Sequence, residues 1–217
     1  MFLSLTNFTS PDKKLPKPSA IFSSEDIYQQ LNLHKLGLSE TAFHLAMNGL
    51  QKLEAEGKVE KEIISICDFS QSSNNRRLYV IDIPNRKLLF NCLVAHGKNS
   101  GEEFARYFSN VPSSYKSSLG FYTTQKTYMG EHGLSLKLEG KEPGFNDMAE
   151  TRSIVMHGAD YVCDDFICHN GRLGRSFGCP SVPNNLLEPI INTIKNGTCL
   201  FIYYPDKQYL SSSKLIR

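Results

Sequence analysis

The chain has 217 residues, of which 40% are hydrophobic and 21% are charged, and its formal net charge at pH 7 is +2. This composition fits one globular domain, or one domain with a small appendage, and excludes a disordered chain. A net charge this small, with scattered basic residues, argues against nucleic acid as a partner. No apolar run approaches the ~20 residues that cross a bilayer, so no membrane span is expected.

The first 60 residues are expected to differ in character from the rest of the chain. Residues 1–22 contain prolines and little periodicity, and we predict an irregular arm. Residues 23–60 are predicted to form a small helical segment. Its strongest pattern spans residues 39–57, where Ser39 is suited to cap a helix, apolar residues recur every three or four positions, and Gly57 is suited to end it.

From residue 61 to residue 217 the pattern predicts one mainly β domain of the α+β class. Short runs rich in apolar and β-branched residues alternate with turn residues such as Pro84, which favours a mostly antiparallel sandwich or barrel. The segment 182–197 is predicted to be helical. The predicted strands lie within residues 62–70, 76–84, 87–97, 117–125, 134–140, 152–158 and 198–204.

Six cysteines in a chain of this length do not make a disulfide framework. Three of them lie in apolar, strand-like runs and are expected to be buried free thiols: Cys67, Cys92 and Cys199. The other three lie in the stretch "HGADYVCDDFICHNGRLGRSFGCPSVP", residues 157–183. This stretch also holds two histidines, and it therefore carries the strongest candidates for chemistry.

A metal site and a disulfide are both conceivable within this stretch. Zinc ligands are available in His157, Cys163, Cys168, His169 and Cys179, but their spacing matches no regular zinc motif, so the leading interpretation contains no metal or other cofactor. In an oxidising compartment, Cys163 and Cys168 would be candidates for a disulfide that closes a small loop.

A thiol nucleophile is the third interpretation, and it centres on Cys179. Gly178 permits a sharp turn and Pro180 keeps the cysteine extended, so that its sulfur is presented to a cleft. The amides of Gly178 and Cys179 are candidates for an oxyanion hole. His157, at the end of a predicted strand, is the candidate base, because a thiol near its reference pKa of about 8.5 needs activation.

Charged neighbours complete this hypothesis. Arg172 and Arg175 offer positive charge near the thiol, and Asp160 or a backbone carbonyl would orient the imidazole. An alternative for Arg175 is a structural ion pair with Asp160 or Asp164.

The segments "IVMHGADYV" and "GRLGRSFGCPSVP" resemble the L,D-transpeptidase (YkuD-like) catalytic domain, and most closely its murein L,D-transpeptidase branch. The likeness covers roughly residues 40–205 and implies a β-rich cysteine peptidyltransferase fold. In the family's motif, a His-Gly pair is followed by Ser/Thr-His-Gly-Cys. Phe177 stands where the larger family has histidine, and the spacer between the two halves is longer than usual.

The resemblance implies a role for each matching residue. Cys179 would be the nucleophile and His157 the general base, with the Gly158 carbonyl orienting the imidazole. Ser176 takes the Ser/Thr position and is a candidate for substrate binding. Arg175 is a candidate for holding a substrate carboxylate. Weaker candidates for lining the site are Tyr128, His132 and His96.

The implied reaction is attack by Cys179 on a stem tetrapeptide of peptidoglycan, followed by transfer of the acyl group from a thioester to an amine acceptor. The alternatives are an L,D-carboxypeptidase, endopeptidase or amidase with the same Cys-His site, or a non-catalytic, zinc-stabilised wall-binding module. Such a substrate implies a periplasmic or cell-envelope location. The opening "MFLSL" is too short for a signal-peptide core, so we expect an export signal to be missing from this sequence.

Overall fold

The computed structural model describes residues 24–217, so the predicted arm lies outside the described residues. Two helices open the described chain, α1 (Ser24–Gln30) and α2 (Glu40–Ala55), separated by a short 3₁₀ turn, η1 (Leu33–Leu36). The hydroxyl of Ser39 caps α2 by accepting a hydrogen bond from the amide of Ala42, at 3.3 Å. The helical segment is thus as predicted.

The β-strands follow from residue 63, and each of the seven predicted strand regions overlaps one, although β4 extends five residues beyond its predicted end. Their bounds are β1 (Ile63–Asp68), β2 (Leu78–Asp82), β3 (Lys87–Cys92), β4 (Gly120–Gly130), β5 (Gly133–Gly140), β6 (Val155–Gly158), β7 (Ser181–Val182) and β8 (Cys199–Tyr203). The two-residue strand β7 was not predicted, because it is too short to show any periodicity.

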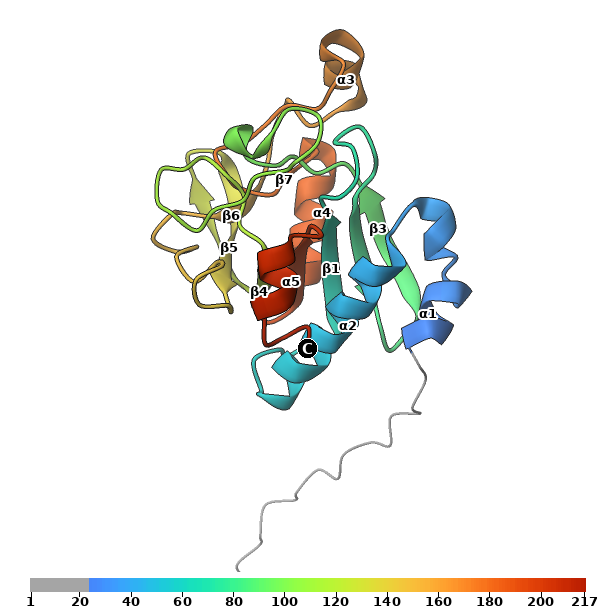
Figure 1. Ribbon diagram of the computed structural model, residues 1–217. Coiled ribbons are helices and arrows are strands. Elements are labelled where there is room, and N and C mark those ends of the chain that lie inside the picture. Colours follow the sequence, from blue (N-terminus) through green and yellow to red (C-terminus); the bar gives the residue numbers. More distant parts are fainter. Residues whose placement is uncertain (1–23) are drawn as a thin grey trace, which may run out of the picture.

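The strands form one mixed sheet in the order β3-β2-β1-β8-β4-β5-β6-β7. Most neighbours are antiparallel, as predicted, whereas β1 pairs with β8 and β6 pairs with β7 in parallel. The chain beyond β3 also bridges to β7, where Ala95 pairs with Ser181. The two ends of the sheet therefore meet, and the sheet curls into a nearly closed barrel (Figure 1).

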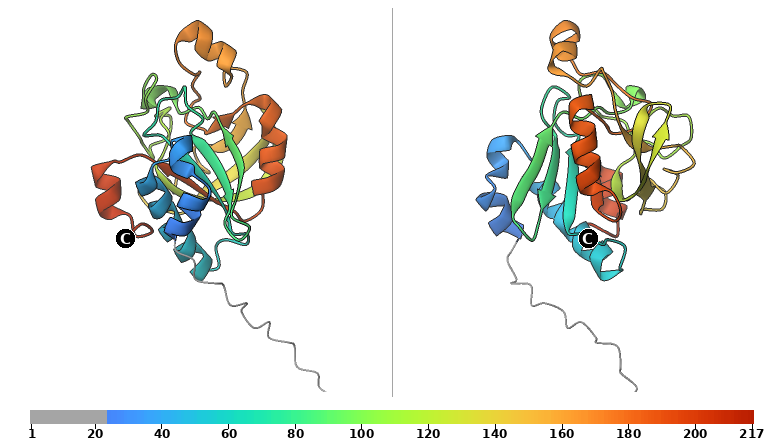
Figure 2. Two further views of the ribbon diagram at one scale, coloured as in Figure 1. Left: turned by 90° about the vertical axis from the view of Figure 1, so that its right-hand side faces the viewer. Right: turned by 180° about the vertical axis from the view of Figure 1, so that it is seen from behind.

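Helices cover the sheet from different sides. Helix α2 packs against β1 and β8, and α4 (Asn184–Ile194) packs against β5 and β6. Figure 1 views the molecule from the side of α2, and Figure 2 (right) views it from the side of α4. The approach of α2 is so close that a Cβ at Gly49 would lie 2.0 Å from the ring of Phe121, which excludes any larger residue there.

One buried apolar cluster joins these layers. It includes Ile27 of α1, Phe43 of α2, Phe201 of β8, Ile190 of α4 and Tyr209 of α5 (Lys207–Ser212). Because the N-terminal helices share the core of the sheet, they belong to the same folded unit. Cys67, Cys92 and Cys199 are buried free thiols, as predicted.

The stretch between β6 and β7 contains a helix that stands away from the body of the molecule, α3 (Asp164–Asn170) (Figures 1 and 2). None of its residues is fully buried. The loops on both sides of it are held by a second, small apolar cluster that includes Leu93, Ala95, Val162 and Leu173. The insertion is thus anchored at its base, next to the closure of the barrel.

Candidate active site

The candidate thiol lies where the two ends of the sheet meet. The amide of Ala95 donates to the carbonyl of Ser181 at 2.8 Å, and the amide of Ser176 donates to the carbonyl of His96 at 3.0 Å. Cys179 lies between these two connections on the 176–181 segment. Barrel closure therefore fixes the backbone on both sides of the sulfur.

A tight turn presents Cys179. Gly178 has φ +129°, and a Cβ there would lie 2.8 Å from the carbonyl oxygen of Lys116, so only glycine fits. The buried hydroxyl of Ser176 accepts a hydrogen bond from the Gly178 amide at 3.0 Å and donates to the Cys179 carbonyl at 2.6 Å. Ser176 thus clamps the turn from inside.

The sulfur of Cys179 is half-buried and has two partners among residues 24–217. The amide of Val155 donates to Sγ at 3.5 Å, and the thiol donates to the carbonyl of Ser153 at 3.7 Å. Ser153 has φ +53°, a strained conformation for serine that is typical of functional sites. Burial raises the pKa of the Cys179 thiol, whereas the Val155 amide and the charge of Arg152 lower it.

Arg152 is a site residue to which the sequence interpretation gave no role. Its guanidinium donates to the carbonyls of Ser109 at 2.7 Å and Lys116 at 2.6 Å, and also to the hydroxyl of Ser118. These bonds fix a cation beside Cys179. Arg152 is the first residue of the predicted strand region 152–158, but only the tertiary fold shows that its charge lies close to Cys179.

The candidate base His157 is buried on β6. Its Nδ1 donates to the carbonyl of Gly158 at 2.8 Å, and its Nε2 accepts from the hydroxyl of Ser181 at 2.9 Å. The ring stacks on that of His132, with centroids 4.5 Å apart, at the tip of the β4–β5 hairpin. Burial lowers the pKa of His157, the Gly158 carbonyl raises it and His132 lowers it further.

The two amides proposed for an oxyanion hole differ in this structure. The Gly178 amide is bonded to Ser176, as described above. The Cys179 amide donates to none of residues 24–217, so of the two amides it is the one that can donate to a ligand.

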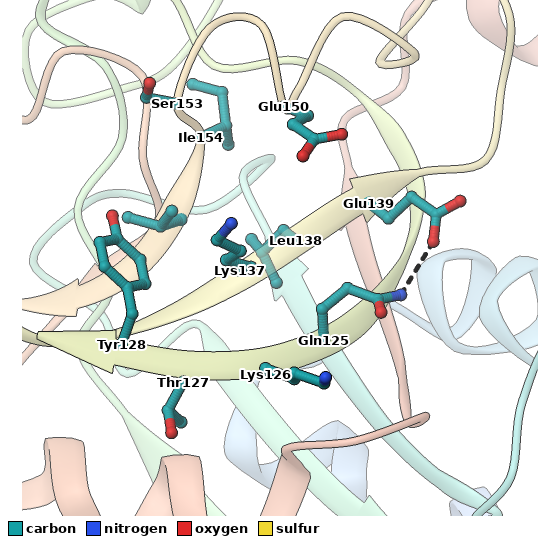
Figure 3. Close-up of a pocket in the computed structure, with 11 residues that line it drawn as sticks. Gln125, Lys126, Thr127, Tyr128, Lys137, Leu138, Glu139, Glu150, Ser153 and Ile154 are labelled. Atoms are coloured by element: carbon teal, nitrogen blue, oxygen red, sulfur yellow. Dashed lines mark hydrogen bonds between the residues drawn. The ribbon is translucent and has the colours of Figure 1, made fainter. Parts of the chain in front are cut away.

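A cavity of about 700 Å³ is lined by residues of β4, of β5 and of the 150–155 segment (Figure 3). Ser153 and Val155, the two residues that contact the thiol, also line this cavity. Tyr128 of β4 lines it as well, and Lys137 of β5 and Glu150 point into it from opposite sides (Figure 3). The cavity is therefore lined by polar and charged side chains, and it shares Ser153 and Val155 with the surroundings of the thiol.

Arg175 lies elsewhere, in a network that holds the 98–102 loop. It donates to the carbonyls of Lys98 and Gly101, both at 3.0 Å, and forms an ion pair with Glu102 at 2.7 Å. Arg172 also pairs with Glu102, at 2.8 Å. The ion pair anticipated as an alternative is therefore present, but its partner is Glu102, because this loop folds over the 172–175 segment.

His96 is completely buried and supports the same loop. Arg77 donates to its Nδ1 at 2.7 Å, and its Nε2 donates to the carbonyl of Gly101 at 3.3 Å. Burial and the adjacent Arg77 charge lower the pKa of His96 to about 3. His96 therefore lies behind the site and does not line the cavity.

Phe177 projects outward from the turn and is 63% exposed. Its ring packs on Tyr115, with centroids 4.9 Å apart, and the ammonium of Lys98 lies 4.5 Å from its centroid. An aromatic and basic surface thus occupies the place where the resemblance implied a histidine.

The cysteines of the insertion are unpaired in the structure. Cys163 and Cys168 are free, so the disulfide considered for an oxidising compartment is not formed here. Sγ of Cys163 caps α3 by accepting from the amide of Phe166 at 3.4 Å, while Cys168 is exposed. Within residues 24–217, ligand atoms cluster at Glu25, Glu40 and His44, and the fold does not bring the five zinc candidates together.

Comparison with known families decides the relationship. Residues 34–203 match the model of the L,D-transpeptidase catalytic domain. The chain belongs to this family. A search of curated proteins gave no match.

Solved L,D-transpeptidases are similar to the chain only at low identity. An enzyme from Mycobacterium smegmatis is 10% identical over 66% of this chain and 59% of its own, with a TM-score of 0.41. L,D-transpeptidase 3 from Mycobacterium tuberculosis is 12% identical over 66% and 61%, with a TM-score of 0.40. An L,D-transpeptidase from Xylanimonas cellulosilytica is 13% identical over 90% and 100%, with a TM-score of 0.38.

The similarity thus spans about three fifths of each mycobacterial transpeptidase, and membership of the family rests on the catalytic-domain model. None of the helices within residues 24–217 is long and apolar enough to cross a membrane.

Proposed function

We propose that the protein is a cysteine peptidyltransferase that acts on peptidoglycan stem peptides through a thioester at Cys179. The observation that carries this proposal is the position of the thiol. It is held by barrel closure, polarised by the Val155 amide and Arg152, and bordered by residues of the 700 Å³ cavity. Membership of the L,D-transpeptidase catalytic-domain family supports the same chemistry.

The first half-reaction forms the acyl-enzyme. The proton of the Cys179 thiol passes to Nε2 of His157, and the thiolate attacks the amide carbon between a diamino acid and the following D-residue. The Cys179 amide stabilises the tetrahedral oxyanion. His157 then returns the proton to the departing amine, the C–N bond breaks, and a thioester remains on Cys179.

The second half-reaction transfers the acyl group. His157 takes a proton from the acceptor amine, the amine attacks the thioester carbon, and the thiolate leaves and is reprotonated. The product is a new amide bond between two stem peptides. Water in place of the amine would give hydrolysis by the same steps.

The cavity suggests where the donor peptide binds. Tyr128 lines the cavity and His132, at the hairpin tip, stacks on the ring of His157, so both are proposed to contact substrate. Arg175 and His96 are proposed to act indirectly, by holding the 98–102 loop, and Ser176 by holding the turn. A peptidoglycan substrate places the protein in the cell envelope.

Incubation with a purified tetrapeptide muropeptide, followed by mass spectrometry, tests the proposal. Loss of the terminal D-residue together with a crosslinked dimer is expected, and both should disappear in Cys179→Ala. Loss without a dimer would indicate a hydrolase. Turnover by Cys179→Ala equal to that of the parent would refute the thiol mechanism.

A metal analysis addresses the non-catalytic alternative. We expect Cys163→Ser and Cys168→Ser to leave the muropeptide products unchanged. Stoichiometric zinc that is lost in either variant, in a protein without turnover, would instead indicate a zinc-stabilised binding module.

A further inference from the structure

A chain of two hydroxyl groups, from the half-buried Tyr161 and the fully buried Ser181, ends on the candidate base. Ser181 of β7 lies opposite His157 of β6 in the parallel register, and its side chain is fully buried. Its Oγ lies 2.9 Å from Nε2 of His157 and 3.3 Å from the hydroxyl of Tyr161. Nε2 is the atom that must accept a proton, and in this structure it faces Ser181.

The direction of each hydrogen bond in this series of hydroxyl groups follows from the Gly158 carbonyl, which binds the other nitrogen of the His157 ring. The Gly158 carbonyl can only accept, so Nδ1 of His157 carries a proton. In the neutral imidazole Nε2 is then an acceptor, so Ser181 donates to it. Because the Ser181 proton is used, its oxygen is left to accept from the Tyr161 hydroxyl.

The insertion supplies Tyr161. The Tyr161 carbonyl accepts from the Gly174 amide at 3.0 Å, and a Cβ at Gly174 would lie 2.3 Å from Cβ of Tyr161. Tyr161 also packs on the small apolar cluster at the base of the insertion, which contains Val162 and Leu173. The extra residues between the two halves of the motif thus place a hydroxyl beside Ser181.

We propose that Ser181 and Tyr161 are positioning residues that form a reversible hydroxyl chain, which keeps Nε2 of His157 hydrogen-bonded in both of its protonation states. This inference rests on the proposed function, in which His157 is the base. It adds two residues to the site, one of them carried by the insertion.

The chain is suited to this role because hydroxyl groups both donate and accept. When Nε2 holds the proton taken from Cys179 and no reacting atom accepts it, Oγ of Ser181 accepts it. The Ser181 proton then turns toward the oxygen of Tyr161, and the Tyr161 proton turns away. No heavy atom moves and the number of protons is conserved. Without the chain, a buried imidazolium would have an unpaired N–H.

Two variants with one control test the inference. The background carries Cys163→Ser and Cys168→Ser, so that Cys179 is the one thiol that is not fully buried. Ser181→Ala removes the partner of Nε2, Tyr161→Phe removes only the far hydroxyl, and Ser181→Thr retains a hydroxyl. The rate of Cys179 alkylation by iodoacetamide is measured between pH 5 and about pH 9 for each.

We expect Ser181→Ala to slow alkylation about 10- to 100-fold near neutral pH, Tyr161→Phe to slow it less, and Ser181→Thr to restore most of the rate. His132 stacks on the ring of His157, and the charge of Arg152 acts on the Cys179 thiol. Because these groups are the same in every variant, a shift in the pH profile is caused by the change in the hydroxyl chain. Unchanged profiles in Ser181→Ala and Tyr161→Phe would overturn the proposal.

Nitrogen NMR of the His157 ring gives a readout that needs no turnover. Since hydrogen bonds to charged groups are about twice as strong as neutral ones, Ser181→Ala should lower the pKa of His157 further. An unchanged His157 titration in a folded Ser181→Ala protein would refute the proposed hydroxyl chain, even if Cys179→Ala is inactive. A changed titration would support the hydroxyl chain even if the muropeptide assay refutes the thiol mechanism. If Ser181→Ala does not fold, Tyr161→Phe decides.

Discussion

Replacing Gly178 by alanine tests whether the turn positions the thiol. Gly178 has φ +129°, where an L-residue is strained by about 1–3 kcal/mol. The new Cβ would also lie 2.8 Å from the Lys116 carbonyl oxygen, which belongs to the backbone and cannot rotate away. Overpacking of this kind adds about 1–3 kcal/mol, so the total loss of unfolding free energy should be about 2–6 kcal/mol.

The matched control is Gly171→Ala, at the end of α3. Gly171 also has a positive φ, +73°, but no atom lies within 4 Å of a Cβ there, so only the backbone cost of about 1–2 kcal/mol applies. Each kcal/mol lowers the melting temperature by about 2–4 °C in a protein of this size. Gly178→Ala should therefore melt well below Gly171→Ala.

Alkylation of Cys179 separates positioning from stability. In the Cys163→Ser, Cys168→Ser background, Gly178→Ala should slow the reaction with iodoacetamide more than tenfold at a temperature where the protein is folded, because the sulfur leaves the Val155 amide. Gly171→Ala should stay within about twofold of the parent. Equal melting temperatures and equal alkylation rates for the two variants would show that this reasoning is wrong.

Two further predictions concern stability. His96 has a pKa of about 3 in the folded protein, below the unfolded value of about 6.5. Between these two pH values the unfolded chain binds more protons than the folded protein does. The free energy of unfolding should therefore fall as the pH drops from about 6.5 toward 3. The contribution is about 1.4 kcal/mol per pH unit, and denaturant unfolding of His96→Asn should show a flatter dependence; an identical slope would contradict the assignment. Separately, Cys163→Ala should cost up to about 1 kcal/mol of unfolding free energy through the lost cap of α3, Cys163→Ser should not, and Cys168→Ala should have no effect. Equal stabilities for both Cys163 variants would show that the cap contributes nothing.

Much of the candidate site was accessible from the sequence because its signals are local. Gly178 next to Cys179 predicts a sharp turn, and His157 follows a run that reads as a strand. The resemblance to the L,D-transpeptidase catalytic domain joined these two segments. The positions of Arg175 and His96 were harder to predict, because the sequence does not show whether a polar residue is exposed or buried. Only the fold shows that both side chains donate hydrogen bonds to the 98–102 loop.

Arg152 and Ser181 were missed for a related reason. Arg152 acts on the thiol through a guanidinium fixed by carbonyls from the 109–118 loop, more than thirty residues earlier in the chain. Ser181 reaches His157 only because β7 pairs in parallel with β6. Neither relation leaves a periodic pattern or a spacing in the sequence.

The amino-acid sequence by itself determined where α1, α2, α4 and the strands of four residues or more lie, because hydrophobic periodicity, caps and glycine act within a few residues. The short helices α3 and α5 were not predicted. The sequence also determined the pair of segments that carries the candidate thiol and the candidate base. The order of the strands, with β8 between β1 and β4, and the closure of the barrel at Ala95 and Ser181 were decided by tertiary structure. These pairings join residues far apart in the chain, and their free energy comes from burying side chains in a common core.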